Sequence, residues 1–216
     1  MSPRLTPQQL NDKYGAFWNV TQRFGLRQGL DEHGKAKYRA IDDHKESENN
    51  LAAAKMQKIP MAGVGAIMAM VRRLSQAFPQ TFDQDEYAIL GGSEDLESAY
   101  RQVALPDSQL RIAITAVFNP DTNQIDLHEL FGQPFGAGHA VPTFYRLAEW
   151  LNRAARRLLF IVMDHFFDDY FYLEPKFAAP SATWAFRRLA ALTGVNLSDE
   201  KAQLPTQLLT CLGIVF

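Results

Sequence analysis

Residues 158–173 read LLFIVMDHFFDDYFYL, an apolar and aromatic run that is interrupted by Asp164-His165 and by Asp168-Asp169. Two adjacent carboxylates in such a run are costly to bury unless a positive charge neutralises them. If the run folds as a hairpin, the acidic pair lies at its turn and can point into a cleft. Magnesium favours such carboxylate oxygens together with substrate phosphates. For Asp168-Asp169 alone, a simple tight turn, which aspartate favours, is the better interpretation.

A third acidic residue changes that balance. Residues 94–103 read EDLESAYRQV and follow a strand expected at Glu86–Leu90, which meets the flexible Gly91-Gly92 before a short helix begins. An aspartate at a strand end, Asp95, together with a carboxylate pair on a distant hairpin, is what a two-metal site needs. In such a site the ions lie roughly 4 Å apart, and one activates an attacking hydroxyl while the other stabilises the leaving oxygen. Taken singly, Asp95 is equally compatible with a helix cap.

The rest of the chain mixes helical and strand patterns without regular βαβ alternation. The expected helices are residues 7–14, Ala62–Phe78, a helix that carries Phe144 to Leu158, and a helix that follows Ser181 as N-cap and ends at Gly194. The expected strands are Phe24–Leu26 and Tyr38–Ile41 around the turn Asp31–Gly34, the hairpin Arg111–Phe118 with Asp126–Phe131, and a last strand at Leu208–Phe216. The predicted fold class is therefore α+β with an antiparallel sheet.

Composition describes an ordinary globular chain of 216 residues with 47% hydrophobic and 21% charged residues. No apolar run approaches the roughly 20 residues that span a bilayer, and the first ten residues contain no signal-peptide core, so we expect no membrane partner. The single cysteine, Cys211, excludes an internal disulfide and predicts an intracellular location, in cytoplasm or nucleus. The net charge of −2 does not favour nucleic acid, but residues 21–40 hold five basic residues against two acidic ones. On charge alone, that stretch is best interpreted as a solvated loop.

Six motifs follow one another in order from about Phe24 to Phe216, nearly the whole chain. They are residues 34–43 (GKAKYRAIDD), 95–102 (DLESAYRQ), 133–144 (QPFGAGHAVPTF), 166–169 (FFDD), 194–201 (GVNLSDEK) and 212–216 (LGIVF). In this order they resemble motifs of the reverse transcriptases of retroelements: the fingers motif, the first palm motif, the Leu-Pro-Phe-Gly motif, the Tyr-x-Asp-Asp box, the glycine-to-lysine motif and the Leu-Gly segment at the primer grip. Any one motif is weak evidence for this resemblance, whereas six motifs in the same order are strong evidence.

This resemblance implies a right-hand polymerase with fingers at 1–85, to which 106–133 contributes a hairpin, and a palm at 86–216 with an antiparallel sheet backed by helices. The thumb is expected to be absent, because the sequence stops after the primer-grip segment. The run Ile41-Asp42-Asp43 and Phe135 resemble the corresponding residues in reverse transcriptases of LTR or tyrosine-recombinase retrotransposons. Two departures are the residues Gly91-Gly92-Ser93-Glu94, where the family has an apolar strand, and Phe166 in place of tyrosine.

The same resemblance implies roles for individual residues. Asp95 and Asp168 would hold two Mg²⁺ ions, for which Mn²⁺ can substitute, with Asp169 as weaker support. Tyr100 would be the steric gate against a ribose 2′-hydroxyl, and a packed aromatic is its alternative. Lys201 would donate a proton to the leaving pyrophosphate, which is general acid catalysis, although a lone lysine is more often solvated.

The remaining candidate residues would contact the incoming nucleotide. Lys37 and Arg39 would bind its triphosphate, Arg39 more readily because its planar fork suits phosphate; Lys35 is the alternative if the register shifts by two. Phe135 and Gly136 would pack beside the nascent base pair, where glycine allows close approach, or simply form a turn before a helix. His165 and Asp164 receive no role, because adjacent side chains on a strand point to opposite faces.

The leading interpretation is thus an RNA-directed DNA polymerase, a nucleotidyltransferase that adds dNTPs to a primer on an RNA or DNA template. Its expected further partner is the rest of a retroelement polyprotein, with thumb and RNase H. A non-catalytic remnant that only binds nucleic acid is the second interpretation. An RNA-dependent RNA polymerase is the third, and Tyr100 argues against it.

Overall fold

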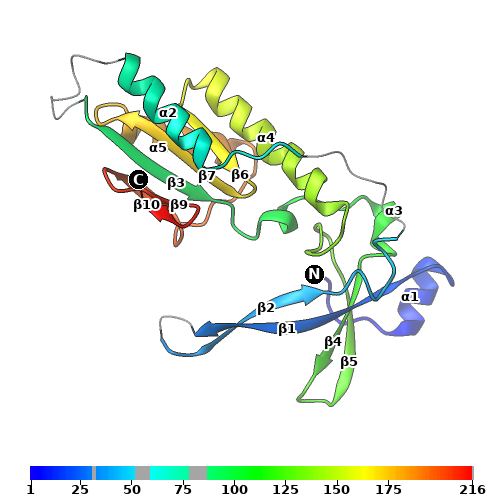
Figure 1. Ribbon diagram of the computed structural model, residues 1–216. Helices are drawn as coiled ribbons and strands as arrows, with labels where there is room; N and C mark the ends of the chain where they lie inside the picture. The colour runs from blue at the N-terminus through cyan, green and yellow to red at the C-terminus, as the bar shows by residue number, and fades with distance from the viewer. Residues whose placement is uncertain (31–32, 52–58, 78–86, 216) are drawn as a thin grey trace. The chain divides into compact units, whose positions relative to one another are not determined.

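The computed structural model describes residues 1–30, 33–51, 59–77 and 87–215. The chain divides into two compact units, each assembled from two separate segments (Figure 1). Unit 1 comprises Met1–Gln57 and Tyr100–Phe144, and unit 2 comprises Lys58–Ala99 and Tyr145–Phe216. The predicted fingers segment and the predicted palm segment therefore each contribute residues to both units, and the 106–133 hairpin lies in unit 1.

Unit 1 contains a four-stranded sheet with the order β2-β1-β4-β5. Its strands are β1 (Val20–Leu30), β2 (Ala36–Asp42), β4 (Ile114–Asn119) and β5 (Gln124–Glu129). Neighbours are antiparallel except β1 and β4, which run parallel from Val20 opposite Ile114. Helix α1 (Pro7–Tyr14) begins at a capping box of Thr6 and Gln9, and helix α3 (Asp107–Leu110) lies before β4. A small core packs Leu105, Leu110, Ala113 and Leu130 against Tyr14.

The outer part of the β1–β2 hairpin is exposed on both faces. Residues 24–30 and 36–40 are all exposed. The register places Leu26 opposite Arg39 and Arg27 opposite Tyr38, so Lys37 and Arg39 share one face of β2 and Tyr38 lies on the other. An exposed hairpin that carries both aromatic and basic side chains is typical of a binding surface rather than of a core.

Unit 2 contains a second four-stranded sheet, wholly antiparallel, with the order β6-β7-β3-β8. Its strands are β3 (Ile89–Asp95), β6 (Met163–Phe166), β7 (Asp169–Pro175) and β8 (Gln203–Thr206). The helices are α2 (Val64–Ala77), α5 (Ala179–Leu192) and the second part of α4 (Ala140–Leu158), which continues from unit 1. A short hairpin of β9 (Thr210–Cys211) and β10 (Ile214–Val215) ends the chain.

Strand β7 is buried on both faces, which explains the long aromatic run around it. Phe171 and Leu173 form a core with Ile67 and Leu74 of α2. On the opposite face, the Tyr170 ring packs against Phe186 of α5, and the Tyr172 hydroxyl lies 2.6 Å from Thr183 Oγ1. Because side chains alternate along a strand, a central strand covered by helices on both sides reads as continuously apolar.

The α+β class with antiparallel pairing is confirmed, and several elements differ in detail from the sequence predictions. Gly91-Gly92 lie inside β3 rather than after it, and a 3-10 turn, η2 (Ala99–Gln102), replaces the predicted short helix. Ser181 is not the N-cap of α5: Ala178 is, and the Ser181 hydroxyl donates to the Ala178 carbonyl at 2.7 Å.

The last strand was predicted as one piece. Leu212 and Gly213 adopt positive φ of +51° and +77°, which breaks it into β9 and β10. Strand β8 was not predicted. The predicted turn residues Asp31 and Glu32, the helix end at Phe78, the strand start at Glu86 and the last residue Phe216 lie outside the described residues. Within the described ranges, no helix is both long and apolar enough to cross a membrane.

Candidate active site

Two of the three predicted carboxylates meet at the end of the unit 2 sheet. Strand β3 ends at Asp95, strand β7 begins at Asp169, and the antiparallel register pairs these two residues directly. Asp95 is only 7% exposed and Asp169 is half-buried. Paired residues of an antiparallel ladder project to the same face, so their side chains lie within reach of each other.

The proximity of these carboxyl groups changes the acidity of Asp169. Burial, a hydrogen bond with the Asp95 carboxyl and the negative charges of Asp168 and Asp95 together raise the pKa of Asp169 to about 7. The site thus concentrates negative charge, and Asp169 holds its proton more tightly than an ordinary aspartate. Like charges held close together in this way are characteristic of functional sites.

Lys201 is the cation of this cluster. Its ammonium lies 2.7 Å from Asp95 Oδ1, and this hydrogen bond raises the pKa of Lys201. The segment after α5 follows the end of β3: the Ser198 amide donates to the Asp95 carbonyl at 2.8 Å, and Leu197 bridges to Leu96. This pairing brings the predicted glycine-to-lysine segment to the carboxylates.

Asp168 occupies the turn between β6 and β7. Because Phe166 pairs with Asp169, Phe167 and Asp168 form a two-residue loop, and the Asp168 carbonyl accepts a hydrogen bond from the Leu96 amide at 3.2 Å. The turn interpretation of Asp168 is therefore correct, and its half-buried carboxylate also acts electrostatically on Asp169. Among the described residues, no group of three or more His, Cys, Asp or Glu side chains is arranged to hold a metal ion.

The carboxylates of Asp95, Asp168 and Asp169 are nevertheless suitable ligands for Mg²⁺. Carboxylate oxygens are the ligands that Mg²⁺ prefers, and a divalent cation would relieve the repulsion that makes Asp169 retain its proton near neutral pH. A cavity of about 230 Å³ opens beside these groups and is lined by Asp95, Asp169, Lys201, Gln203 and Cys211, among others. Burial, and then the Asp169 charge, raise the pKa of the Cys211 thiol to about 11, so Cys211 is not a nucleophile at neutral pH.

The nucleotide-contacting candidates all lie in unit 1. Lys37 and Arg39 are exposed on β2, and Lys35 is exposed just before it. The half-buried Tyr100 ring packs edge-on against Phe135, with centroids 4.9 Å apart, and lies 4.7 Å from Phe144. The packing interpretation therefore describes the surroundings of Tyr100, and its role as a gate stays a prediction.

Gly136 is a position where the backbone demands glycine. Its φ is +91°, and a Cβ added there would lie 2.8 Å from the Asp42 carbonyl oxygen. The loop is also tied down by Asn50, whose side chain donates to the Gly136 carbonyl at 3.0 Å and accepts from the Gly138 amide at 2.6 Å. Phe135 and Gly136 thus form a turn before α4, as the alternative interpretation expects, and the close approach of the Asp42 backbone also requires glycine here.

Several charged residues near these sites were missed by the sequence interpretation. Arg187 of α5 donates to both carboxylate oxygens of the buried Glu94, at 2.7 and 3.2 Å, and so neutralises the residue before Asp95. In unit 1 the fully buried Asp42 carboxylate accepts hydrogen bonds from Arg23 at 2.7 and 2.9 Å and from Arg101 at 3.3 Å. Arg187 and Glu94 are 93 positions apart, so no local pattern could have paired them.

The structure thus gathers Asp95, Asp168, Asp169 and Lys201 within unit 2. Lys37, Arg39, Tyr100, Phe135 and Gly136 all belong to unit 1, where Tyr100 and Phe135 contact each other. His165, which received no role from the sequence, is buried beside the acidic turn and contacts Glu149 of α4. In comparisons with known proteins, no protein-family model matches this chain, and no curated protein matches it.

Proposed function

We propose that this chain is the fingers-and-palm part of a reverse transcriptase, an RNA-directed DNA polymerase whose acidic centre is Asp95, Asp168 and Asp169. One observation carries the proposal. Two motifs that are far apart in the sequence deliver Asp95 and Asp169 to directly paired positions at one end of a sheet, and a third motif delivers Lys201 to the same place. If Asp95 were only a helix cap and Asp168-Asp169 only a turn, these residues would have no reason to lie together. A phosphoryl-transfer centre requires that they do.

In the proposed reaction the primer 3′-hydroxyl oxygen forms a bond to the α-phosphorus of a dNTP, and the bond from that phosphorus to the bridging oxygen breaks to release pyrophosphate. Mg²⁺ held by Asp95 and Asp168, with support from Asp169, would supply charge stabilisation of the attacking and leaving oxygens. Lys201 stays protonated because its pKa is raised, so it can donate a proton to a leaving oxygen next to Asp95.

The unit 1 residues would serve the incoming nucleotide. Arg39, with its planar fork, and Lys37 would bind the triphosphate, and both project from the same exposed face of β2. Tyr100, supported by its packing against Phe135, would exclude a 2′-hydroxyl. Gly136 would allow the backbone to approach the nascent base pair closely.

Primer extension on an RNA template with Mg²⁺ tests this proposal. The parent chain should extend the primer, and Asp168→Asn should abolish extension while its circular dichroism spectrum and thermal midpoint remain near those of the parent. Glu200→Gln is the matched control, because Glu200 is an exposed acid of the same unit with no role in the site. Equal extension by Asp168→Asn and the parent would make the assignment wrong.

A second measurement does not depend on turnover. Binding of Mg²⁺ or Mn²⁺ to the native state raises its stability, by about 2.7 kcal/mol when the free ion is at 100 times its dissociation constant. The parent and Glu200→Gln should show this rise in thermal midpoint, and Asp168→Asn should not. A rise of the same size in all three proteins would place the ion elsewhere.

A second candidate function is nucleic-acid binding without catalysis. The observation that favours it is the exposed β1–β2 hairpin, which presents Phe24 on the same face as Lys37 and Arg39, and Tyr38 with Arg27 on the other face. Aromatic and basic side chains together are typical of single-strand binding surfaces. Tight binding of a primer–template without extension, and without a stability gain from Mg²⁺, would support this candidate over the polymerase.

A further inference from the structure

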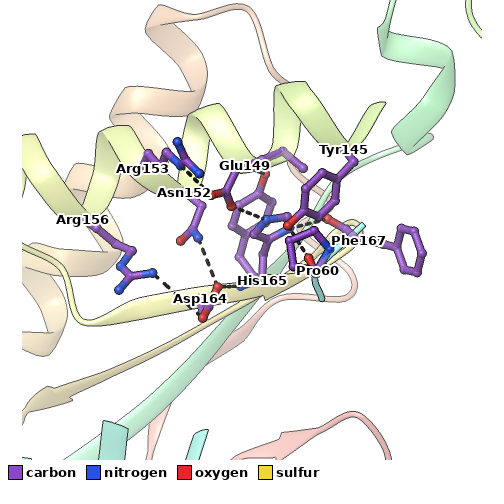
Figure 2. Close-up of polar contacts among 11 residues, drawn as sticks. Pro60, Tyr145, Glu149, Asn152, Arg153, Arg156, Asp164, His165 and Phe167 are labelled. Atoms are coloured by element: carbon purple, nitrogen blue, oxygen red, sulfur yellow. Dashed lines mark hydrogen bonds and ion pairs between the residues drawn. The ribbon is translucent and has the colours of Figure 1, made fainter. Parts of the chain in front are cut away.

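His165 connects helix α4 to the turn that carries the acidic pair (Figure 2). The imidazole belongs to β6 and is almost fully buried, with 2% of the residue exposed. Its Nε2 lies 3.1 Å from Glu149 Oε2 on α4, and its Nδ1 lies 3.0 Å from the carbonyl oxygen of Phe167. One ring thus bridges a helix and the loop Phe167–Asp168.

Both partners of the ring are hydrogen-bond acceptors. A carbonyl oxygen cannot donate. Burial opposes ionisation of Glu149, but hydrogen bonds from Arg153 and His165 outweigh it and lower the pKa of Glu149, so this carboxyl group is ionised at neutral pH. Each ring nitrogen thus faces an acceptor, so the ring lies where its N–H groups can donate to α4 or to the Phe167–Asp168 loop.

Aromatic rings hold the imidazole in place. The rings of Tyr145 and Tyr170 pack against it, with centroids 5.3 and 5.4 Å from its own. Asp164 accepts the backbone N–H of His165 at 2.9 Å and the Asn152 amide at 3.1 Å. Charged neighbours include Arg153, which donates to Glu149, and Arg156, which lies 4.0 Å from Asp164.

The contact with Phe167 matters because this residue is strained. Its φ is +53°, in the left-handed region that two-residue hairpin loops use and that glycine, asparagine and aspartate prefer. A phenylalanine persists there only if its surroundings hold it. The Phe167 carbonyl belongs to the peptide group that leads into Asp168, so a hydrogen bond to this oxygen also orients the acidic residue.

From this arrangement we infer that His165, which contacts Glu149 and the Phe167 carbonyl, is a positioning residue that fixes the Phe167–Asp168 peptide and thereby the acidic pair Asp168-Asp169. The effect of His165 on catalysis rests on the proposed function. The contacts of His165 with Glu149 and with the Phe167 carbonyl, here called the clamp, belong to the fold itself. The clamp can therefore be tested without nucleotide or metal.

The first test measures the contact between the ring and Glu149. In the whole chain labelled with ¹⁵N-histidine, long-range ¹H–¹⁵N correlations should show hydrogen-bonded His165 nitrogens in the parent and a clear shift of these signals in Glu149→Gln. Arg157→Ala is the matched control, because Arg157 is an exposed cation of the same helix, eight positions from Glu149. His165 signals that are the same in the parent and in Glu149→Gln would overturn the inference.

The second test uses His165→Phe, which keeps a ring between the tyrosines and removes both ring nitrogens. Single-nucleotide extension should show kcat lowered by about ten- to a hundredfold with the KM for dNTP little changed, as for other residues that orient a catalytic ligand. Adding Phe167→Gly relieves the strained φ and should restore part of the lost rate. If the double variant instead loses kcat by the product of the two single effects, His165 is only a packing residue.

The clamp can also be decided if the parent extends no primer. That result would overturn the proposed function, and amide hydrogen exchange at Asp168 and Asp169 would then be compared between the parent and His165→Phe. Faster exchange in His165→Phe, restored toward the parent by Phe167→Gly and absent in Arg157→Ala, supports the clamp. Unchanged exchange in His165→Phe overturns it.

Discussion

Asp169 illustrates how a single residue can lower the stability of the fold that contains it. Its pKa in the folded chain is about 7 instead of the ordinary 3.8, because burial, the Asp95 carboxyl and the Asp168 charge oppose its ionisation. The folded state therefore binds this proton more tightly than the unfolded state. The resulting contribution to stability is fully present below the ordinary pKa and is lost as the pH rises through about 7. Asp169→Asn, which cannot ionise, should therefore unfold at a higher temperature than the parent at about pH 8 and show little difference at about pH 4.

Thermal unfolding of parent and variant across this pH range measures the effect. Glu200→Gln serves as the control for loss of one acidic charge, because Glu200 is exposed. Equal pH profiles for the parent and Asp169→Asn would contradict the crowding of carboxylates at this end of the sheet.

At the scale of elements, the glycines of β3 allow the acidic strand to lie against β7. A Cβ on Gly92 would collide with the ring and hydroxyl of Tyr172, and one on Gly91 would lie 2.8 Å from Leu209 Cβ. This explains why glycines replace the apolar residues expected before Asp95. Gly92→Ala should destabilise unit 2 by about 1–3 kcal/mol, the usual range for overpacking, and should displace Asp95 from Asp169.

Gly65→Ala is the matched control, since its added Cβ meets nothing within 4 Å on α2. Alanine favours helix over glycine, so this variant should be as stable as the parent or more stable by up to about 1 kcal/mol. Urea denaturation compares the two variants, and a fully stable Gly92→Ala would show that Tyr172 can move aside.

At the scale of the whole molecule, the net charge of −2 provides no general attraction for nucleic acid, so any binding depends on local groups. If Arg39 binds the triphosphate, Arg39→Ala should raise the KM for dNTP by about ten- to a hundredfold, which corresponds to loss of a charged hydrogen bond of about 1.5–3 kcal/mol. Arg39→Lys keeps the charge and loses the planar fork, so it should restore only part of the affinity. Steady-state extension kinetics measure both variants.

Arg188→Ala, at an exposed position of α5, controls for loss of a surface charge. Should Arg39→Ala leave the KM for dNTP unchanged but reduce the slope of log K against log salt by about 0.9 in duplex binding, Arg39 contacts the nucleic-acid backbone instead.

The sequence by itself determined the local elements, because their causes are local. The helix expected at residues 7–14 forms, the hairpin expected at Arg111–Phe118 and Asp126–Phe131 forms as β4 and β5, and the aromatic run folds as a hairpin with Asp168 in its turn. It also indicated Asp95, Asp168, Asp169 and Lys201 through their motifs. Periodicity specifies which side chains share a face, and capping or turn chemistry specifies where an element ends.

Only the tertiary structure decided which of these elements meet. The register of β3 on β7 pairs Asp95 with Asp169, the segment after α5 brings Lys201 to Asp95, and α4 provides Glu149 for His165. The division of the last strand into β9 and β10, with positive φ at Leu212, also depends on packing rather than on propensity. Side-chain pattern constrains a face and not its partner, so contacts between distant segments become defined only when the whole sheet buries its apolar surface and selects one register.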